Sequence, residues 1–159
     1  MEQRIYQAAS VSLPNVAPGQ LRTATDNDLE VMQQWTYSFV RECGLNHDLA
    51  TIRKLVKNSV NMGNRYIWEV NGNPATMASV GGPTPSGIRI SSVYTPRELR
   101  GQGYGSSAVF SLTNKMLSQG KRFCFLYTDL ANATSNSIYQ RIGYSPVSDS
   151  THHSFATNR

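Results

Sequence analysis

The sequence predicts an α/β protein, an α+β sandwich of helices against one mixed sheet. Apolar residues recur at helical spacing in residues 23–43 and 47–62, and the pattern changes to the alternation of a β-hairpin in residues 65–80. Residues 88–129 then run strand, helix, strand, which is the order of a right-handed crossover between parallel neighbours. The length of 159 residues is enough for one domain with a substantial core.

The first helical segment has a start signal in its sequence. Thr25 and Asp28 have the spacing of a capping box, in which a hydroxyl and a carboxylate satisfy the exposed N–H groups of a helix start. The apolar residues that follow at helical spacing predict one buried stripe: Leu29, Met32, Trp35, Phe39 and Cys43.

The strand predicted at residues 88–95 changes its phase. Ile88 and Ile90 share one parity, whereas Val93 takes the other. One face stays buried through such a change only if an extra residue is inserted, as in a β-bulge. We therefore predict a bulge at residues 91–92, with a ragged strand as the alternative.

Three further segments complete the predicted elements. Residues 122–129 are almost continuously apolar, which favours a strand buried on both faces. Residues 132–142 predict a last helix, and residues 152–156 are a weaker candidate for a strand. Residues 1–20 hold a strand-like run and then a loop rich in proline, asparagine and glycine.

Composition narrows the classes of function. The net charge is +5, but the basic residues are scattered, and the one modest cluster (Arg53, Lys54, Lys57) has no interleaved aromatic residues, so we expect no nucleic-acid partner. No apolar run is long enough to span a membrane. Cys43 and Cys124 lie in apolar segments and predict two buried thiols in a cytoplasmic protein. No His or Cys pair has the spacing of metal ligands, so no metal is predicted.

The sequence LRGQGYGSSA, residues 99–108, predicts a phosphate-binding turn at a helix start. A helix N-terminus has unpaired N–H groups and a partial positive charge, and glycines let the backbone approach an anion closely. A dinucleotide fold is one interpretation, because Gly101, Gly103 and Ser106 nearly spell G-x-G-x-x-G, and Asp129 stands where a ribose-binding acid is expected. That turn should follow the first strand of a repeated βαβ sheet, however, and here it follows a hairpin.

The second interpretation is a resemblance to a known family. Arg100-x-x-Gly103-x-Gly105, preceded by VYTPREL, resembles motif A of the GNAT superfamily of acetyl-CoA-dependent N-acyltransferases. The downstream NATSNSIYQRIGY resembles the second cofactor segment of that family, and LYTDLANATSN resembles a bacterial subgroup. The resemblance extends over residues 21–147. The residues of the second segment that fall on the pattern are Asn132, Ser135, Tyr139, Gly143 and Tyr144.

The resemblance implies a fold and a domain organisation. In GNAT folds a mostly antiparallel sheet carries helices on both faces, and a bulge splays its central parallel pair, so that the pantetheine arm of the coenzyme enters the gap. We expect residues 21–159 to form this domain. Residues 1–20 are then an N-terminal strand or tail, or the remnant of a preceding domain.

The resemblance also implies acetyl-CoA as co-substrate and the residues that hold it. A backbone N–H near Tyr94 would polarise the thioester carbonyl. The side chains of Arg100 and Ser106 would bind phosphate, although tying down the loop and capping the helix are equal alternatives. The expected cofactor-binding residues are Val93, Tyr94, Thr95, Arg100, Gly101, Gln102, Gly103, Tyr104, Gly105, Ser106, Asn132, Ser135 and Tyr139.

The implied reaction is attack of an amine on the acetyl thioester. Tyr139 would stabilise the leaving thiolate, and Glu69 is a candidate base, with an exposed strand charge as the alternative; His152 and His153 are expected to be solvated. The acceptor would be a small-molecule or peptide amine, and a homodimer is left open. A different class of function is a domain that binds acetyl-CoA without transferring the acetyl group, as a sensor or interaction module.

Overall fold

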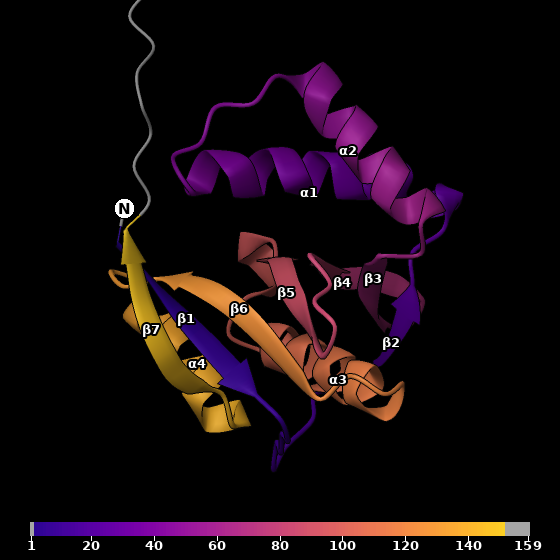
Figure 1. Cartoon of the computed structure of the whole chain (residues 1–159). Helices are drawn as coiled ribbons and strands as arrows, with labels where there is room; N and C mark the ends of the chain where they lie inside the picture. Colours follow the sequence, from indigo (N-terminus) through magenta and orange to yellow (C-terminus); the bar gives the residue numbers. More distant parts are fainter. Residues whose placement is uncertain (1, 152–159) are drawn as a thin grey trace, which may run out of the picture.

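The structure is a computed structural model that describes residues 2–151 (Figure 1). Within these residues seven strands form one sheet in the order β2–β3–β4–β5–β6–β1–β7, and only the β5–β6 pair is parallel. The strands are β1 (Glu2–Ala8), β2 (Gln20–Thr23), β3 (Arg65–Val70), β4 (Asn73–Gly81), β5 (Gly87–Tyr94), β6 (Phe123–Asp129) and β7 (Ser145–Thr151). The helices are α1 (Leu29–Glu42), α2 (Leu49–Asn61), α3 (Tyr104–Ser118) and α4 (Ala133–Ile142), with 3₁₀ turns η1 (Asp26–Asp28) and η2 (Arg97–Leu99).

The helices lie on both faces of the sheet, which confirms the predicted fold class. α1 and α2 cover β3, β4 and β5 on one face, and α3 and α4 lie on the other (Figure 1). The core under α1 and α2 contains Met32, Ile52, Ile67 and Met77. The core under α3 and α4 contains Leu112, Ile142, Ile90, Leu126 and Tyr6.

The predicted capping box forms at the start of α1. The Thr25 backbone N–H donates to Asp28 Oδ2 at 2.8 Å, and the Thr25 side chain accepts from the Asp28 backbone. The box closes the 3₁₀ turn η1, from which α1 continues at Leu29.

The predicted bulge is present at Ser92. Met77 pairs with Tyr94, and Ser79 pairs with Ser91. An advance of two residues along β4 therefore corresponds to three residues along β5, which is one residue extra. Ser92 takes a φ of +52°, in the left-handed region that few residues other than glycine adopt. The phase change that the sequence shows is therefore an inserted residue and not a ragged strand.

β5 and β6 separate just before β5 reaches the bulge. Their pairing begins at Gly87 with Phe123 and ends at Arg89 with Phe125. Both strands continue past this point, β5 to Tyr94 and β6 to Asp129, without pairing to each other. The central parallel pair is thus splayed at its C-terminal ends.

The prediction that β6 is buried on both faces is wrong. Cys124 and Leu126 are buried under α3 and α4, whereas Phe125 is half-buried and Tyr127 is 36% exposed. The reason is that α1 and α2 pack over β3, β4 and β5 and leave the adjoining face of β6 uncovered. Burial is also only partial for Cys43, which was expected to be buried; both cysteines are free thiols.

The N-terminal strand is an interior strand of the sheet. β1 lies between β6 and β7 and pairs antiparallel with both (Figure 1). Tyr6 has no exposed surface, and its hydroxyl accepts from Gln140 Nε2 at 3.3 Å. After β1 the chain crosses the end of α4, where the Ser12 N–H donates to the Ile142 carbonyl at 2.9 Å. The candidate strand at residues 152–156, with His152 and His153, lies outside the described residues.

We expect Tyr6→Ala to lower the free energy of unfolding by about 3–5 kcal/mol, because it empties a fully buried aromatic site between β1 and α4. Urea unfolding followed by circular dichroism measures this change. Ile5→Ala is the matched control, since Ile5 is only half-buried and should cost less. Equal costs for the two substitutions would show that β1 does not belong to the core.

Candidate functional site

The glycine turn between η2 and α3 presents unpaired backbone N–H groups. Gly101 and Gly103 have φ values of +78° and +81°, which require glycine, and Gly103 caps α3. The first backbone hydrogen bond of the helix runs from the Ser107 N–H to the Gly103 carbonyl at 3.0 Å, so the amides of residues 104–106 precede the helical ladder. A Cβ at Gly101 would meet nothing within 4 Å, which shows open space beside the turn. This geometry suits a phosphate.

Two serines at the start of α3 have different roles. Ser106 is half-buried and its hydroxyl makes no hydrogen bond within residues 2–151, so it remains available to a ligand; no side chain caps the helix there. Ser107 is buried, and its Oγ accepts from the Ala17 N–H at 2.8 Å. Ser107 therefore fixes the linker between β1 and β2 against the turn, a contact that sequence reasoning missed because the two residues are 90 positions apart.

Arg100 ties down its own loop in this structure. Its Nε donates to the Thr95 carbonyl at 2.7 Å, and its Nη2 donates to Glu42 Oε2 at 2.9 Å. The guanidinium also lies over the ring of Tyr94, 5.4 Å from its centroid. Of the two roles that the sequence left open, these contacts favour fixing the loop to the end of α1.

The tip of β5 is anchored away from β6. The Tyr94 ring packs against Trp35 and Phe39 of α1, with centroids 6.3 and 6.4 Å apart. The hydroxyls of Thr95 and Thr76 are 2.8 Å apart, which links the chain after β5 to β4. Contacts to α1 and β4 thus keep Val93, Tyr94 and Thr95 on one side of the gap and leave the β6 side of their backbone unpaired.

The predicted residues of the second segment lie at and along α4. Asn132 caps this helix, since its Oδ1 accepts from the Ser135 N–H at 3.0 Å. Tyr139 packs its ring against Tyr144 with centroids 6.1 Å apart, and burial raises the pKa of Tyr139 to about 12. The Tyr139 hydroxyl has no hydrogen-bond partner within residues 2–151, so it is free to donate to a ligand.

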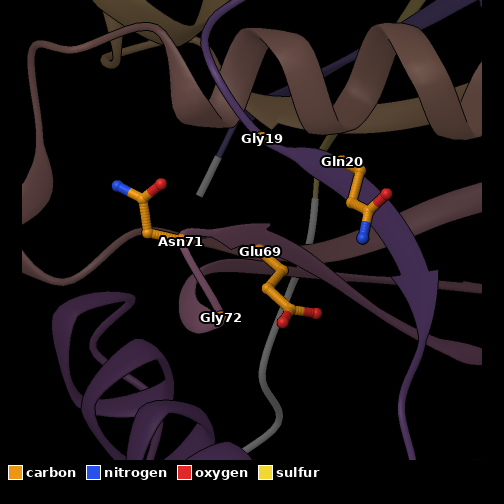
Figure 2. Close-up of a pocket in the computed structure, with 5 residues that line it drawn as sticks. All are labelled: Gly19, Gln20, Glu69, Asn71 and Gly72. Atoms are coloured by element: carbon orange, nitrogen blue, oxygen red, sulfur yellow. The ribbon is translucent and has the colours of Figure 1, made fainter.

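Glu69 has a structural partner. Its carboxylate accepts from Arg22 Nε, and Arg22 also binds Asp28 through two hydrogen bonds of 2.7 and 2.9 Å. Figure 2 shows the Glu69 side chain between β2 and the β3–β4 turn, where it lines an open pocket of about 350 Å³. The other residues of this pocket are Gly19, Gln20, Asn71 and Gly72. Arg22 of β2 thus joins Glu69 of β3 to Asp28 at the start of α1, and the role of Glu69 as a base stays a prediction.

Residues 2–151 contain neither a membrane-spanning helix nor a cluster of metal ligands. No helix within residues 2–151 combines the length and the apolar character that crossing a membrane requires. In the same part of the chain, no three His, Cys, Asp or Glu residues are grouped as a metal site would need.

Comparison with known proteins identifies the fold. The model of the FR47-like protein family matches residues 80–153, and no curated protein matches the chain. A GNAT-family acetyltransferase from Colwellia psychrerythraea superposes with a TM-score of 0.75 at 13% identity, over 91% of this chain and 52% of that one. A putative GNAT acetyltransferase from Novosphingobium aromaticivorans superposes with a TM-score of 0.68 at 17% identity, over 94% of this chain and 62% of that one. A predicted acetyltransferase with acetyl-CoA from Clostridium acetobutylicum superposes with a TM-score of 0.62 at 16% identity, over 87% of this chain and 95% of that one.

These neighbours confirm the GNAT fold that the resemblance implies. This chain is a GNAT-fold protein whose C-terminal half matches the FR47-like family. It spans about half of the Colwellia protein and somewhat less than two thirds of the Novosphingobium protein. The narrower resemblance of LYTDLANATSN to one bacterial subgroup stays a prediction.

The raised pKa of Tyr139 predicts a pH-dependent contribution to stability. Because the folded pKa is about 12 and the unfolded pKa is about 10, the neutral phenol favours folding below pH 10, and this contribution is lost as the pH rises toward 12. The wild-type protein should therefore lose stability relative to Tyr139→Phe between pH 10 and 12. Urea midpoints at pH 9, 10, 11 and 12 measure the difference, and a difference that stays constant over this range contradicts the burial of the phenol.

Proposed function

We propose that this protein is an N-acetyltransferase that moves the acetyl group of acetyl-CoA to an amine by direct attack in a ternary complex. The observation that carries the proposal is the gap between β5 and β6, opened by the Ser92 bulge beside the glycine turn of α3. The Clostridium neighbour is a predicted acetyltransferase with acetyl-CoA, which supports the choice of coenzyme. The two free thiols fit a reducing compartment, so we place the activity in the cytoplasm.

The coenzyme would use two parts of the site. Its pyrophosphate would bind the backbone N–H groups of residues 101–106, with the free hydroxyl of Ser106 as a further donor. Its pantetheine arm would enter the gap and pair with the unpaired backbone of residues 93–95, as a strand would. Asn132 and Ser135 shape the start of α4, the helix that carries Tyr139.

The reaction needs a neutral amine and a stabilised oxyanion. An alkyl ammonium with a pKa near ~10.4 must first lose its proton, and the amine nitrogen then attacks the thioester carbon. The backbone N–H near Tyr94, just after the bulge, would stabilise the oxyanion that forms. Collapse of this intermediate breaks the carbon–sulfur bond and releases the thiolate of coenzyme A, and the extra proton on the nitrogen passes to that thiolate or to water.

The role of Tyr139 is to stabilise the thiolate by hydrogen bonding. A phenol with a pKa of about 12 cannot readily give its proton to a thiolate near ~8.5, because the transfer is uphill by roughly 5 kcal/mol. Its free hydroxyl can donate a hydrogen bond without losing the proton. Glu69 stays the candidate base for the amine, and its ion pair with Arg22 favours a chain of water molecules as the route.

A second candidate function is a domain that binds acetyl-CoA without transferring the acetyl group. The ion pair of Glu69 with Arg22 supports this alternative, because it occupies the candidate base. Stabilisation by acetyl-CoA in a thermal-shift titration, without thiol release over a broad panel of amines, would favour this module. Stabilisation by NAD in place of acetyl-CoA would favour the dinucleotide interpretation.

Tyr139→Phe separates catalysis from binding. We expect it to lower kcat by about 10-fold or more, the usual contribution of one donor to a developing charge, while the Kd for acetyl-CoA changes less than about twofold. A thiol-release assay gives kcat, and calorimetry gives Kd. Tyr37→Phe on α1 is the matched control, since its hydroxyl bonds only Arg41. Unchanged turnover in Tyr139→Phe would remove Tyr139 from the mechanism.

A further inference from the structure

We propose that the acceptor is a primary amine that carries a carboxylate and an apolar side chain, and that Arg89, beside Tyr127, binds the carboxylate. This inference rests on the proposed function and names the substrate class of the same site. It starts from the closed end of the gap, where Arg89 and Phe125 form the last pair between β5 and β6.

Arg89 and Tyr127 face the side of the sheet that α1 and α2 occupy. Met77 points to this side, because its sulfur lies 3.8 Å from the Thr36 hydroxyl of α1. Alternation along β4 puts Gly81 on the same face, and Gly81 pairs with Arg89. The guanidinium of Arg89 lies 4.4 Å from the centroid of the Tyr127 ring, so both side chains share this face.

This face is open to a second substrate. The glycine turn and Tyr139 belong to α3 and α4, so the coenzyme would enter from the opposite face. α1 and α2 leave β6 uncovered, and Tyr127 is 36% exposed. In this proposal the amine approaches the thioester from the α1–α2 side, where Arg89 and Tyr127 lie at the start of the gap.

Two arginines on this face, Arg89 and Arg65, lack a carboxylate partner among residues 2–151. Arg4, Arg22 and Arg100 each pair with a carboxylate. Within residues 2–151, Arg89 makes no ion pair. Its guanidinium lies over the Tyr127 ring. Arg65 is only 7% exposed, and its Nε donates to the Ser59 hydroxyl at 2.9 Å.

Burial alone lowers the pKa of Arg65 to about 10, with no acidic group opposing it, and the side chain stays cationic at neutral pH. Arg65 pairs with Ser79, and Ser79 pairs with Ser91 at the bulge. The two serine hydroxyls are 3.1 Å apart and link β4 to β5 at the bulge. Arg65 therefore adds a buried positive charge on this face of the sheet, two strands from Arg89.

The surroundings favour a carboxylate on an apolar molecule. The planar guanidinium of Arg89 matches the two oxygens of a carboxylate, and its single exposed charge suits a monoanion. Phe123, Phe125 and Tyr127 follow one another along β6, with successive ring centroids 6.3 Å apart. Two of these rings are half-buried and Tyr127 is exposed, so the row would receive an apolar side chain. An apolar amino acid has the primary amine, the carboxylate and the apolar side chain that the proposed site requires.

The test compares two ligands that differ only in the carboxylate. Calorimetry on the protein saturated with coenzyme A would measure binding of N-acetyl-L-phenylalanine and of N-acetylphenethylamine, which lacks the carboxylate. We expect the carboxylate form to bind at least 10-fold more tightly, and Arg89→Gln to abolish that preference. Arg122→Gln is the matched control, because Arg122 is an exposed cation next to β6 and its loss changes the net charge equally.

Equal affinities for the two ligands, or no binding of either one, would overturn the inference. An equal loss of preference in Arg89→Gln and Arg122→Gln would also overturn it, because net charge alone would then explain the effect. A thermal-shift titration with acetyl-CoA reports separately on the proposed function. Failure of the acceptor assignment can therefore be told from failure of the coenzyme site.

Discussion

The inserted residue at Ser92 is the constraint on which the rest of the site depends. A parallel pair with matched strands would hydrogen-bond along its full length, and no ligand could enter between β5 and β6. The bulge redirects β5 after Ser91, and the strand accepts a strained φ of +52° at Ser92 to do so. The gap is therefore built into the covalent sequence and does not require a ligand to open it.

The contacts of the surrounding elements keep the gap open. Tyr94 packs on α1, Thr95 bonds Thr76 of β4, and Arg100 joins the loop after β5 to Glu42 at the end of α1. On the other side β6 is held by β1, an interior strand. A Cβ at Gly105 of the glycine turn would lie 3.4 Å from Thr95 Oγ1, so the turn adjoins the end of β5, and the proposed sites for the pyrophosphate and the pantetheine arm are neighbours.

Local features of the site could be predicted from the sequence, and long-range ones could not. The parity change at residues 88–93 predicted the bulge, because parity is a local property of a strand. The capping box and the glycine turn are likewise local. The place of β1 between β6 and β7 and the contact of Ala17 with Ser107 depend on residues far apart in the chain. The burial of β6 was predicted wrongly because its apolar run says nothing of how far α1 and α2 extend.

The central claim is that the bulge-opened gap receives the pantetheine arm of acetyl-CoA. A crystal structure of the protein with acetyl-CoA tests it most directly. The account predicts the pyrophosphate on the amides of residues 101–106, the arm hydrogen-bonded to the backbone of residues 93–95, and the thioester carbonyl at the backbone N–H near Tyr94. Coenzyme bound elsewhere on the molecule, or β5 and β6 paired to their ends in that crystal, would contradict it.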